Sequence, residues 1–552
     1  MRASSGNRPR AGHWLLLSAI VALAIAVRVV AIGSQGLSSE ESQIILQADW
    51  TVGEMVLKPT DQTPFLYYAL HKLFLSPDAS LAGMRSISLL FGVLSVGLIY
   101  VLGRIAYGPT GGLLAAALLA VWGMHVQTSQ EADADALLFF LILLASVGLL
   151  LYARAVHAGD GWAMAGLILF GAGNVLSFYT DLVSIAWIAL TSLMLLGLTI
   201  GRRERAWQVA GVLAVMALCA IPGIYRLTGE AAFGVGYSWL QQRGMAGFLR
   251  LCAEVFLPIG SRDSASAGFA LSGIAKAALV AILAVVLAVF AWLGRHRLQA
   301  RLRAEPAVLW LILAYLLMPV LIWLYGFVAQ PLLLAKNILY AVPGVILLIA
   351  GVCTAPGNRA TAWAGCAAVL LYGVSLLATG TVRERENWRA AYDFLAGAVA
   401  AGDVVGICPF HDFASLRYHA DDAVNVPVVT RVDGSTIEIE AALGTDPRWD
   451  QTLFHAALEP HLSRRWTGAQ AGADARGVAG RIDLRPGQSV WRVDGHCGDK
   501  APDMDRAMSA AGYEPGVVRY QDDTGSPATI LIRQYRVIAP ITLEIRDATP
   551  KP

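Results

Sequence analysis

The sequence is poor in charge. Asp, Glu, Lys and Arg make up only 15% of its 552 residues, whereas 56% are hydrophobic, and the mean hydropathy is +0.56. A soluble globular protein does not need this balance. The net charge is +2, and the basic residues form short clusters between apolar stretches instead of one extended face. We therefore expect no nucleic-acid partner.

Cysteine is also sparse, with six in the whole chain. Cys219, Cys353 and Cys366 lie in or beside apolar stretches, where small apolar cysteines are ordinary. Cys408 and Cys497 fall in the polar C-terminal part. A disulfide between them and two unpaired thiols are equally compatible with the sequence.

Long apolar runs take the place of charge. A helix needs about 20 mostly apolar residues to cross a hydrocarbon core, since its backbone amides must be satisfied within the segment. The runs predict a polytopic α-helical membrane protein with about eleven transmembrane helices. The predicted spans are Trp14–Ile32, Met84–Leu102, Gly112–Gln127, Ala136–Ala153, Trp162–Phe178, Leu182–Ile200, Val209–Tyr225, Phe269–Leu293, Ala307–Phe327, Ile338–Cys353 and Ala362–Thr379.

Arginine clusters predict the orientation, because short cytoplasmic loops are enriched in Lys and Arg. The clusters precede the first span and follow the sixth and the eighth, which places the N-terminus in the cytoplasm. The expected location is the inner (plasma) membrane of the cell. Loops 33–83, 128–135 and 228–268 then lie outside. A cleaved signal peptide is the alternative for the first span, but Arg28 and the many later spans argue against it.

Composition changes near Thr381, where the apolar runs stop. We predict a transmembrane core over residues 1–380 and an extracytoplasmic α/β domain over residues 381–552, within the usual size of a domain. The expected elements of that domain are helices at Ala390–Ala401, Phe413–His419 and Asp503–Ala511, and strands at Asp403–Cys408, Val424–Thr430, Gln488–Val493 and Ala528–Arg533.

Two glutamates, Glu40 and Glu41, follow the first span in the external loop. Carboxylates beside lipid lose hydration, and a chain tends to keep them there only when water, a partner or a reaction compensates. Either glutamate would suit a general base that takes the proton of an attacking hydroxyl. Solvated loop residues without a function are the alternative.

Further along the loop, an amphipathic aromatic stretch begins at Asp61 and includes Tyr67 and Tyr68. Tyrosine favours the membrane interface because one end of the ring is apolar and the other binds water. The stretch would bind substrate or order the loop, and an aromatic belt without function is the alternative. Arg85, at the head of the second span, would meet a lipid phosphate or only anchor the helix.

Three acids, Glu131, Asp133 and Asp135, stand within five residues at the start of the fourth span. Like charges four apart on a helix repel unless a cation, a proton or a substrate group intervenes. Acids that favour a helix N-terminus are the alternative. Lys336 opens an external helix end in an apolar setting and would pair with a phosphate or anchor the interface.

The order of these motifs resembles the polytopic C-type glycosyltransferases (GT-C), specifically the protein O-mannosyltransferase-like family 39 and its aminoarabinose-transferase relatives. The sequence departs from that pattern, since Glu40 replaces the usual Asp, Asp133 and Lys336 each replace an Arg, and the His of the first loop is missing. The motifs are Glu40-Glu41, Thr63-Pro64-Phe65-Leu66-Tyr67-Tyr68, Ser129-Gln130-Glu131 with Asp135, Lys336-Asn337, and Asn387-Trp388-Arg389 leading to Gly402-Asp403.

The resemblance implies transfer of a sugar from a polyprenyl-phosphate donor to an acceptor hydroxyl of a protein, glycolipid or envelope polysaccharide on the outer face of the bilayer. Glu40 or Glu41 would be the base, Lys336 and Arg85 would bind the phosphate, and Glu131, Asp133 and Asp135 would order the loop. No cofactor is expected, and a divalent cation is not favoured. A flippase of lipid-linked sugar or a catalytically silent carrier-binding relative are the alternatives, although no internal repeat typical of transporters is visible.

Overall fold

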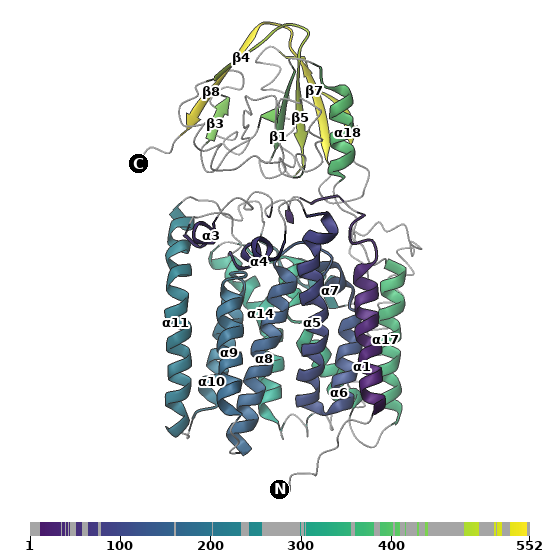
Figure 1. Ribbon diagram of the computed structural model, residues 1–552, viewed down its shortest axis with the longest axis vertical. Helices are drawn as coiled ribbons and strands as arrows, with labels where there is room; N and C mark the ends of the chain where they lie inside the picture. The colour runs from purple at the N-terminus through teal and green to yellow at the C-terminus, as the bar shows by residue number, and fades with distance from the viewer. Residues whose placement is uncertain are drawn as a thin grey trace.

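The computed structural model has a bundle of long, roughly parallel helices and a smaller sheet-containing part beyond one end of it (Figure 1). We call this end of the bundle, nearest the sheets, the site end. The structure describes residues 11–34, 36–38, 40–41, 44, 51–57, 65–75, 79–158, 162–200, 203–232, 242–256, 299, 303, 305–329, 331–354, 359–379, 387–400, 403–408, 415, 428–429, 436–439, 480–495, 513–514, 516–521 and 530–548.

Every predicted span except Phe269–Leu293, which lies outside the described residues, is helical. Among the described residues, six helical stretches are long and apolar enough to cross a membrane, the last of which runs through the break near Tyr340: Ala11–Val29, Leu81–Tyr107, Asp135–Val156, Arg205–Tyr225, Pro306–Val328 and Ala335–Cys353. Two predicted spans are each divided into two helices, with breaks near Trp122 and Tyr340. The long helices are α1 (Ala11–Val29), α5 (Leu81–Tyr107), α8 (Asp135–Ala158), α11 (Arg203–Ala232), α14 (Pro306–Val328) and α17 (Arg359–Thr379), and the shorter apolar ones are α6 (Pro109–Ala120), α9 (Ala163–Phe178), α10 (Ser184–Gly197) and α16 (Val342–Cys353).

Glycine lets α8 and α9 pack with their backbones almost in contact. A Cβ at Gly148 would lie 2.4 Å from the backbone nitrogen of Phe170, and a Cβ at Gly166 would lie 2.6 Å from that of Tyr152. Small residues serve this purpose in membrane bundles, where close van der Waals contact replaces the hydrophobic drive. The pair α8–α9 therefore forms a rigid base for the connections at its ends.

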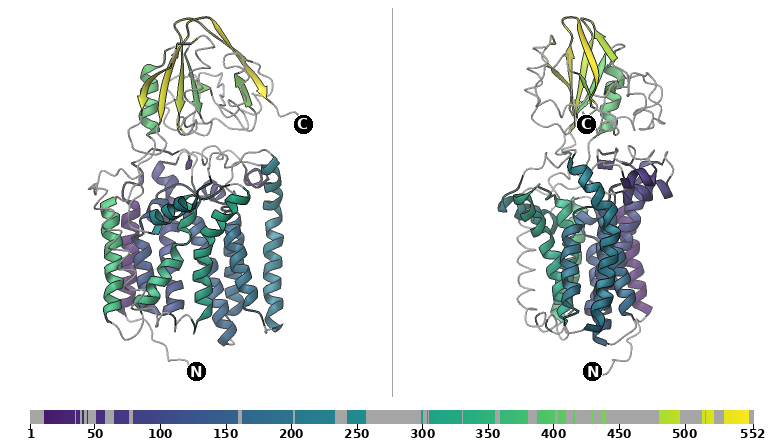
Figure 2. Two further views of the ribbon diagram at one scale, coloured as in Figure 1. Left: turned by 180° about the vertical axis from the view of Figure 1, so that it is seen from behind. Right: turned by 90° about the vertical axis from the view of Figure 1, so that its left-hand side faces the viewer.

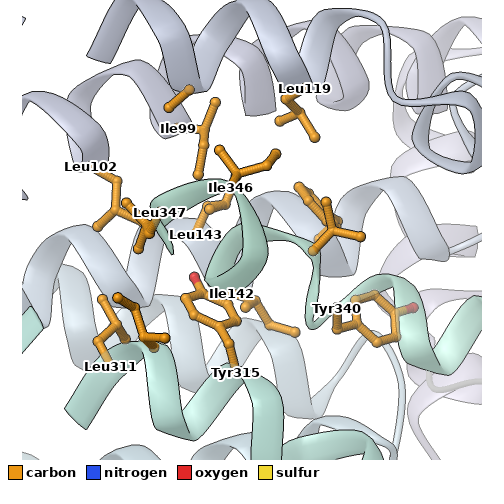
Figure 3. Packing of buried hydrophobic residues seen from close by; sticks show 14 of the residues in the cluster. Ile99, Leu102, Leu119, Ile142, Leu143, Leu311, Tyr315, Tyr340, Ile346 and Leu347 are labelled. Atoms are coloured by element: carbon orange, nitrogen blue, oxygen red, sulfur yellow. The ribbon is translucent and has the colours of Figure 1, made fainter. Parts of the chain in front are cut away.

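The core lies between α5, α6, α8, α14 and α16. Side chains such as Ile99, Ile142, Leu311 and Ile346 meet there from four of these helices (Figure 3). Tyr315 is fully buried among them, and its hydroxyl lies 2.5 Å from Ser146 Oγ, which satisfies both polar groups within the apolar interior.

Short helices cross or cap the site end, as α3 and α4 do in Figure 1. Their sequences are amphipathic or polar at one end, so they lie against the bundle instead of continuing through it. They are α3 (Val52–Leu57), α4 (Leu66–Phe74), α7 (Gly123–Thr128), α12 (Met245–Phe256) and α15 (Ala335–Leu339).

The C-terminal part contains two sheets and the helix α18 (Trp388–Ala398), as the two views in Figure 2 show. The first sheet has the order β2-β1-β5-β7-β6, with β1 parallel to β2 and β5 and the remaining pairs antiparallel. The second has the order β3-β8-β4 and is antiparallel. The strands are β1 (Val404–Cys408), β2 (Val428–Val429), β3 (Thr436–Ile439), β4 (Gly480–Leu484), β5 (Ser489–Asp494), β6 (Val517–Gln521), β7 (Leu531–Arg536) and β8 (Ile541–Ala548).

An apolar cluster joins α18 to one face of the five-stranded sheet. Trp388 and Leu395 of α18 pack with Trp491 and Ile532, and all four side chains are buried. Asp403 fixes the start of β1, since its carboxylate accepts hydrogen bonds from Trp491 Nε1 at 2.9 Å and from the Ser489 backbone at 2.8 Å. The polar part thus has a core of its own.

The predicted elements of this part agree with the structure where the chain is described. The helix expected from Ala390 is α18, and the strands expected at Asp403, Gln488 and Ala528 correspond to β1, β5 and β7. Sequence reasoning missed β3, β4, β6 and β8. The helix expected over 503–511 lies outside the described residues. Of the helix expected over 413–419, only Ser415 is among them.

Candidate active site

Four chain segments bring their polar residues together at the site end of the bundle. They are the helical turn at Glu40 and Glu41, the connection 129–134 between α7 and α8, the connection 179–183 between α9 and α10, and the short helix α15. Each follows or precedes an apolar helix of the bundle, so the bundle determines where these segments lie. The site is therefore assembled from residues almost 300 positions apart in sequence, Glu40 and Lys336.

Lys336 stands at the centre of this arrangement. Its Nζ lies 3.1 Å from Asp133 Oδ2, 3.5 Å from Glu40 Oε1 and 3.8 Å from Asp135 Oδ2. Tyr340, one turn further along, donates a hydrogen bond to Asp135 Oδ1. The Lys336 side chain is 25% exposed and that of Glu40 is 57% exposed, whereas Asp133 and Asp135 lie deeper. A single ammonium thus screens three carboxylates, and the outermost of them, Glu40, faces solvent.

Asp181 is a fourth carboxylate of this group that sequence reasoning missed. It lies in the short connection between α9 and α10, and its Oδ1 accepts a hydrogen bond from the Val183 backbone at 2.9 Å. Its pKa is raised to about 6, mainly by burial and to a smaller extent by the nearby Asp133 carboxylate, while the Val183 N–H and Lys336 act in the opposite direction. The only signal in the sequence was one acid between two apolar runs.

The raised pKa predicts a pH-dependent stability that Asp181→Asn removes. Between about pH 4 and pH 6 the folded protein holds more protons on Asp181 than the unfolded chain, so stability falls as pH rises through this window. Asparagine keeps the acceptor for Val183 N–H but carries no charge. We expect Asp181→Asn to unfold at a higher temperature than wild type above pH 6 and at the same temperature near pH 4, measured in detergent. A difference that does not change with pH would contradict this assignment.

Glu41 and Arg85 form a buried ion pair beside the Lys336 group. Arg85 Nε donates to Glu41 Oε1 at 2.7 Å, and Arg85 Nη2 donates to Glu41 Oε2 at 2.8 Å. The carboxylate also accepts from Ala132 N at 2.9 Å and from Ser38 N at 3.0 Å. Arg85 further binds the carbonyl oxygens of Ile32 at 2.7 Å and Gly36 at 2.8 Å. The pair ties the first loop to α5 and to the connection before α8.

This geometry does not fit the roles predicted for Glu41 and Arg85. Glu41 is 1% exposed and its oxygens are engaged by N–H donors, so no acceptor hydroxyl reaches them. Arg85 is 2% exposed and its guanidinium is held by protein oxygens instead of facing a lipid phosphate. The physical reason is that a carboxylate and a guanidinium in bidentate contact satisfy each other and lose access to solvent together. The contacts of both residues are those of a pair that holds the loop, and their roles in the reaction stay predictions.

The tyrosines of α4 are also part of the support. Tyr67 is buried, and its hydroxyl lies 2.6 Å from Ser88 Oγ, which donates to the Asp133 carbonyl at 3.0 Å. Tyr68 is buried beside it. His71 packs on Tyr67, and burial lowers its pKa to about 4 even though Glu41 acts in the opposite direction. The loop-ordering role fits this arrangement better than substrate contact.

The remaining predicted residues are placed less directly. Asp61 lies outside the described residues. Glu131 is buried in the turn before α8, where its backbone N–H bonds the Thr128 carbonyl, and its role stays a prediction. Within the ranges that the structure describes, no three His, Cys, Asp or Glu side chains are arranged to hold a metal ion.

Chemically, the site offers an exposed carboxylate within 3.5 Å of an ammonium, over a layer of deeper carboxylates. A carboxylate of this kind accepts a proton, and the ammonium stabilises negative charge that develops next to it. Both groups belong to the site end of the bundle.

Comparison with known families connects this site to a sequence signature. Residues 61–225 match the family described as dolichyl-phosphate-mannose-protein mannosyltransferase. This segment includes α4, α5 and the whole of the acidic connection before α8. No curated protein matches the chain by sequence.

Two solved structures of ArnT match the fold of this chain over nearly its full length, and another solved structure matches part of it. ArnT from Cupriavidus metallidurans in the apo state is 14% identical, with a TM-score of 0.52 over 95% of this chain and 98% of that chain. ArnT bound to undecaprenyl phosphate gives 15% identity, the same TM-score and the same coverage. The S. cerevisiae protein O-mannosyltransferase Pmt1-Pmt2 complex bound to the sugar donor is 19% identical with a TM-score of 0.34, over 40% of this chain and 33% of that chain.

The match to ArnT at this identity is a match of fold, and it includes both the helical bundle and the C-terminal sheets. It confirms the fold class, and the family match over residues 61–225 supports the resemblance that the motifs predicted. The chain is thus a multi-pass membrane protein with the GT-C glycosyltransferase fold, similar to family 39, and its residues 61–225 carry the sequence signature of the dolichyl-phosphate-mannose-protein mannosyltransferases.

Proposed function

We propose that the protein transfers a sugar from a polyprenyl-phosphate donor to the hydroxyl of a protein, glycolipid or envelope polysaccharide, with Glu40 as general base. The observation that carries the proposal is the pair of Glu40 and Lys336, an exposed carboxylate 3.5 Å from an ammonium. The family signature over residues 61–225 and the structure of ArnT with undecaprenyl phosphate support a lipid-phosphate carrier.

In the proposed step the acceptor oxygen forms a bond to the anomeric carbon of the sugar while the bond from that carbon to the phosphate oxygen breaks. Glu40 takes the acceptor proton, and the bonding electron pair leaves with the phosphate. The carrier changes from a phosphodiester into a phosphomonoester and gains negative charge. Lys336 stabilises this charge as it develops.

The contacts of Lys336 indicate how Glu40 becomes available. Lys336 is held more closely by Asp133, at 3.1 Å, than by Glu40, at 3.5 Å, and Glu40 is the more exposed of the two. An incoming phosphate oxygen therefore takes the position of Glu40 on the ammonium, since that contact is weakened most by solvent. The displaced carboxylate then faces the acceptor hydroxyl.

The proposal places the site and the domain 381–552 on the extracytoplasmic side, in keeping with the arginine clusters. The sheets lie beyond the site end (Figure 1), where an external domain would contact the acceptor. A cysteine introduced after residue 381 is expected to react with an impermeant thiol reagent in intact cells.

The experiment uses purified protein in lipid vesicles, radiolabelled polyprenyl-phosphate sugars and a membrane extract as acceptor. We expect sugar transfer with release of polyprenyl phosphate. Lys336→Gln should lower the transfer rate about 10²–10³-fold, the usual effect of removing a group that stabilises developing charge. Lys72→Gln, which alters an exposed lysine of α4, is the matched control and should leave the rate unchanged. Carrier binding without transfer by wild type would instead support the silent or transporting relative.

A further inference from the structure

Arg28 is a buried cation near the C-terminal end of α1 that the proposed chemistry does not use. It is fully buried, and each of its five N–H donors is engaged. Nη1 donates to the carbonyls of Ala24 and Ala120, both at 3.0 Å. Nη2 donates to the Leu119 carbonyl at 3.3 Å and to His125 Nδ1 at 2.8 Å, and Nε donates to Ser129 Oγ at 3.2 Å.

None of these partners is a carboxylate. Two are carbonyl groups at the C-terminal end of α6, where the helix dipole favours a positive charge. Because a guanidinium only donates, His125 must accept at Nδ1 and carry its hydrogen on Nε2, as the neutral imidazole. Because all five N–H groups are used at once, the guanidinium of Arg28 satisfies every partner in one position only. The network therefore fixes where Arg28 lies.

Both halves of the candidate site continue from this network. On one side, α1 leads through the segment held by Arg85 to Glu40. On the other, Ser129 opens the connection that carries Asp133 and leads to Asp135 at the start of α8. Asp133 is the closest partner of Lys336, and Asp135 is the most buried one. Arg28 and Ser129, whose hydrogen bond joins the two halves, are 101 residues apart in the sequence.

Gln130 strengthens the same joint from the opposite direction. Its Nε2 lies 3.3 Å, 3.2 Å and 3.0 Å from the carbonyl oxygens of Val27, Arg28 and Val30. These are carbonyls at the end of α1, which lack partners within the helix. The connection after α7 therefore caps α1 while α1 holds the connection.

We propose that Arg28, acting through His125 and Ser129, is a positioning residue that sets the separation of Glu40 from Lys336. The inference rests on the proposed function for its kinetic consequence, but its geometric content does not depend on that function. A misplacement of about 1 Å at a reacting group costs on the order of 10²-fold in rate. A hydrogen-bond network that places the reacting groups therefore affects the rate strongly.

Gly92 of α5 gives a way to disturb the joint without changing its charge. A Cβ at this position would lie 2.2 Å from Ser129 Oγ and 2.6 Å from Ser129 Cβ, so Ser129 must move. The same Cβ would lie 3.5 Å from Arg28 Nε, which is ordinary contact. Gly92→Ala should therefore displace Ser129 and leave the guanidinium intact.

The first measurement is a distance that needs no activity. In full-length protein with the native cysteines replaced by alanine, Glu40→Cys and Lys336→Cys are joined by a short bismaleimide. We expect the cross-linking yield to fall at least about threefold when Arg28→Gln, His125→Leu or Gly92→Ala is added. His125→Asn, whose side-chain oxygen replaces Nδ1 as acceptor, should restore the yield.

The second measurement is the steady-state rate of transfer with the native cysteines and native Glu40 and Lys336. Gly92→Ala and His125→Leu should lower kcat about 10–100-fold with the KM for the donor unchanged, since the donor contacts remain. Tyr315→Phe, which removes a buried hydrogen bond to Ser146 in the middle of the bundle, is the matched control and should change neither the cross-linking nor the rate.

The results separate this proposal from the proposed function. Reduced cross-linking confirms the positioning role even if no transfer is found for wild type. Unchanged cross-linking in Gly92→Ala and His125→Leu overturns it, whatever the rates. Equal losses in His125→Asn and His125→Leu also overturn it, because only bulk packing would then be at stake. If Arg28→Gln fails to fold, these neutral variants still decide the matter.

Discussion

Glu40→Gln is expected to lower sugar transfer about 10²–10⁴-fold, the usual contribution of a general base. Glutamine keeps the size of the side chain and removes only its capacity to take the acceptor proton. Because Glu40 is 57% exposed and its contact with Lys336 is 3.5 Å long, the substitution should leave the unfolding temperature unchanged. Initial rates with radiolabelled donor in vesicles, and thermal unfolding in detergent, measure the two effects.

The control is Glu305→Gln, which neutralises another exposed glutamate that is paired with a basic side chain. Glu305 is 45% exposed and lies 3.3 Å from Arg154, between the start of α14 and the last part of α8. It should transfer sugar at the wild-type rate. Donor binding by Glu40→Gln should also match wild type, since the base acts on the acceptor. A Glu40→Gln variant that transfers sugar at more than about a tenth of the wild-type rate would remove Glu40 from the role of base.

The membrane fold was predictable because its determinants are local. A run of about 20 apolar residues leaves the backbone no alternative to a helix, and each such run specifies its own element. The breaks near Trp122 and Tyr340 were not visible in this way. Trp122 donates from Nε1 to the Val255 carbonyl at 2.9 Å, a contact with a residue 133 positions away that no local pattern announces.

The site was predictable in its residue types but not in its pairing. The sequence placed Glu40 and Glu41 together and could not tell them apart, because the difference arises from the contacts of Arg85 and Ala132 with Glu41, which come from distant parts of the chain. In the same way Lys336 was singled out as a candidate, but its carboxylate partners become visible only when α15 meets the segment at the start of α8.

Buried networks are the hardest feature to predict from sequence. An arginine inside an apolar span, such as Arg28, indicates a function or a partner in general terms. Its partners are carbonyl groups of α6 and the side chains of His125 and Ser129. Because every residue has a backbone carbonyl, the sequence does not show which of them accept hydrogen bonds. Asp181 escaped notice for a related reason, since its environment comes from three other segments.

The largest expected effect on stability comes from Glu41→Gln. Removing one member of a buried ion pair leaves the other charge uncompensated, at a cost of about 3–5 kcal/mol. Here Arg85 would keep its contacts with the Ile32 and Gly36 carbonyls but lose the carboxylate that neutralises it. We expect the free energy of unfolding of Glu41→Gln, measured by denaturant titration in mixed micelles, to fall by this amount.

Two comparisons make that measurement decisive. Arg154→Gln breaks the exposed pair with Glu305 and should cost less than about 1 kcal/mol, because solvent screens such a contact. The double replacement Glu41→Gln/Arg85→Met should be less destabilised than the sum of the two single variants, since it removes the uncompensated charge. If Glu41→Gln were as stable as wild type and yet inactive, Glu41 and not Glu40 would be the base. If instead its activity is lost only in proportion to its folded fraction, the two adjacent glutamates have separate tasks, one in the reaction and one in holding the loop that presents it.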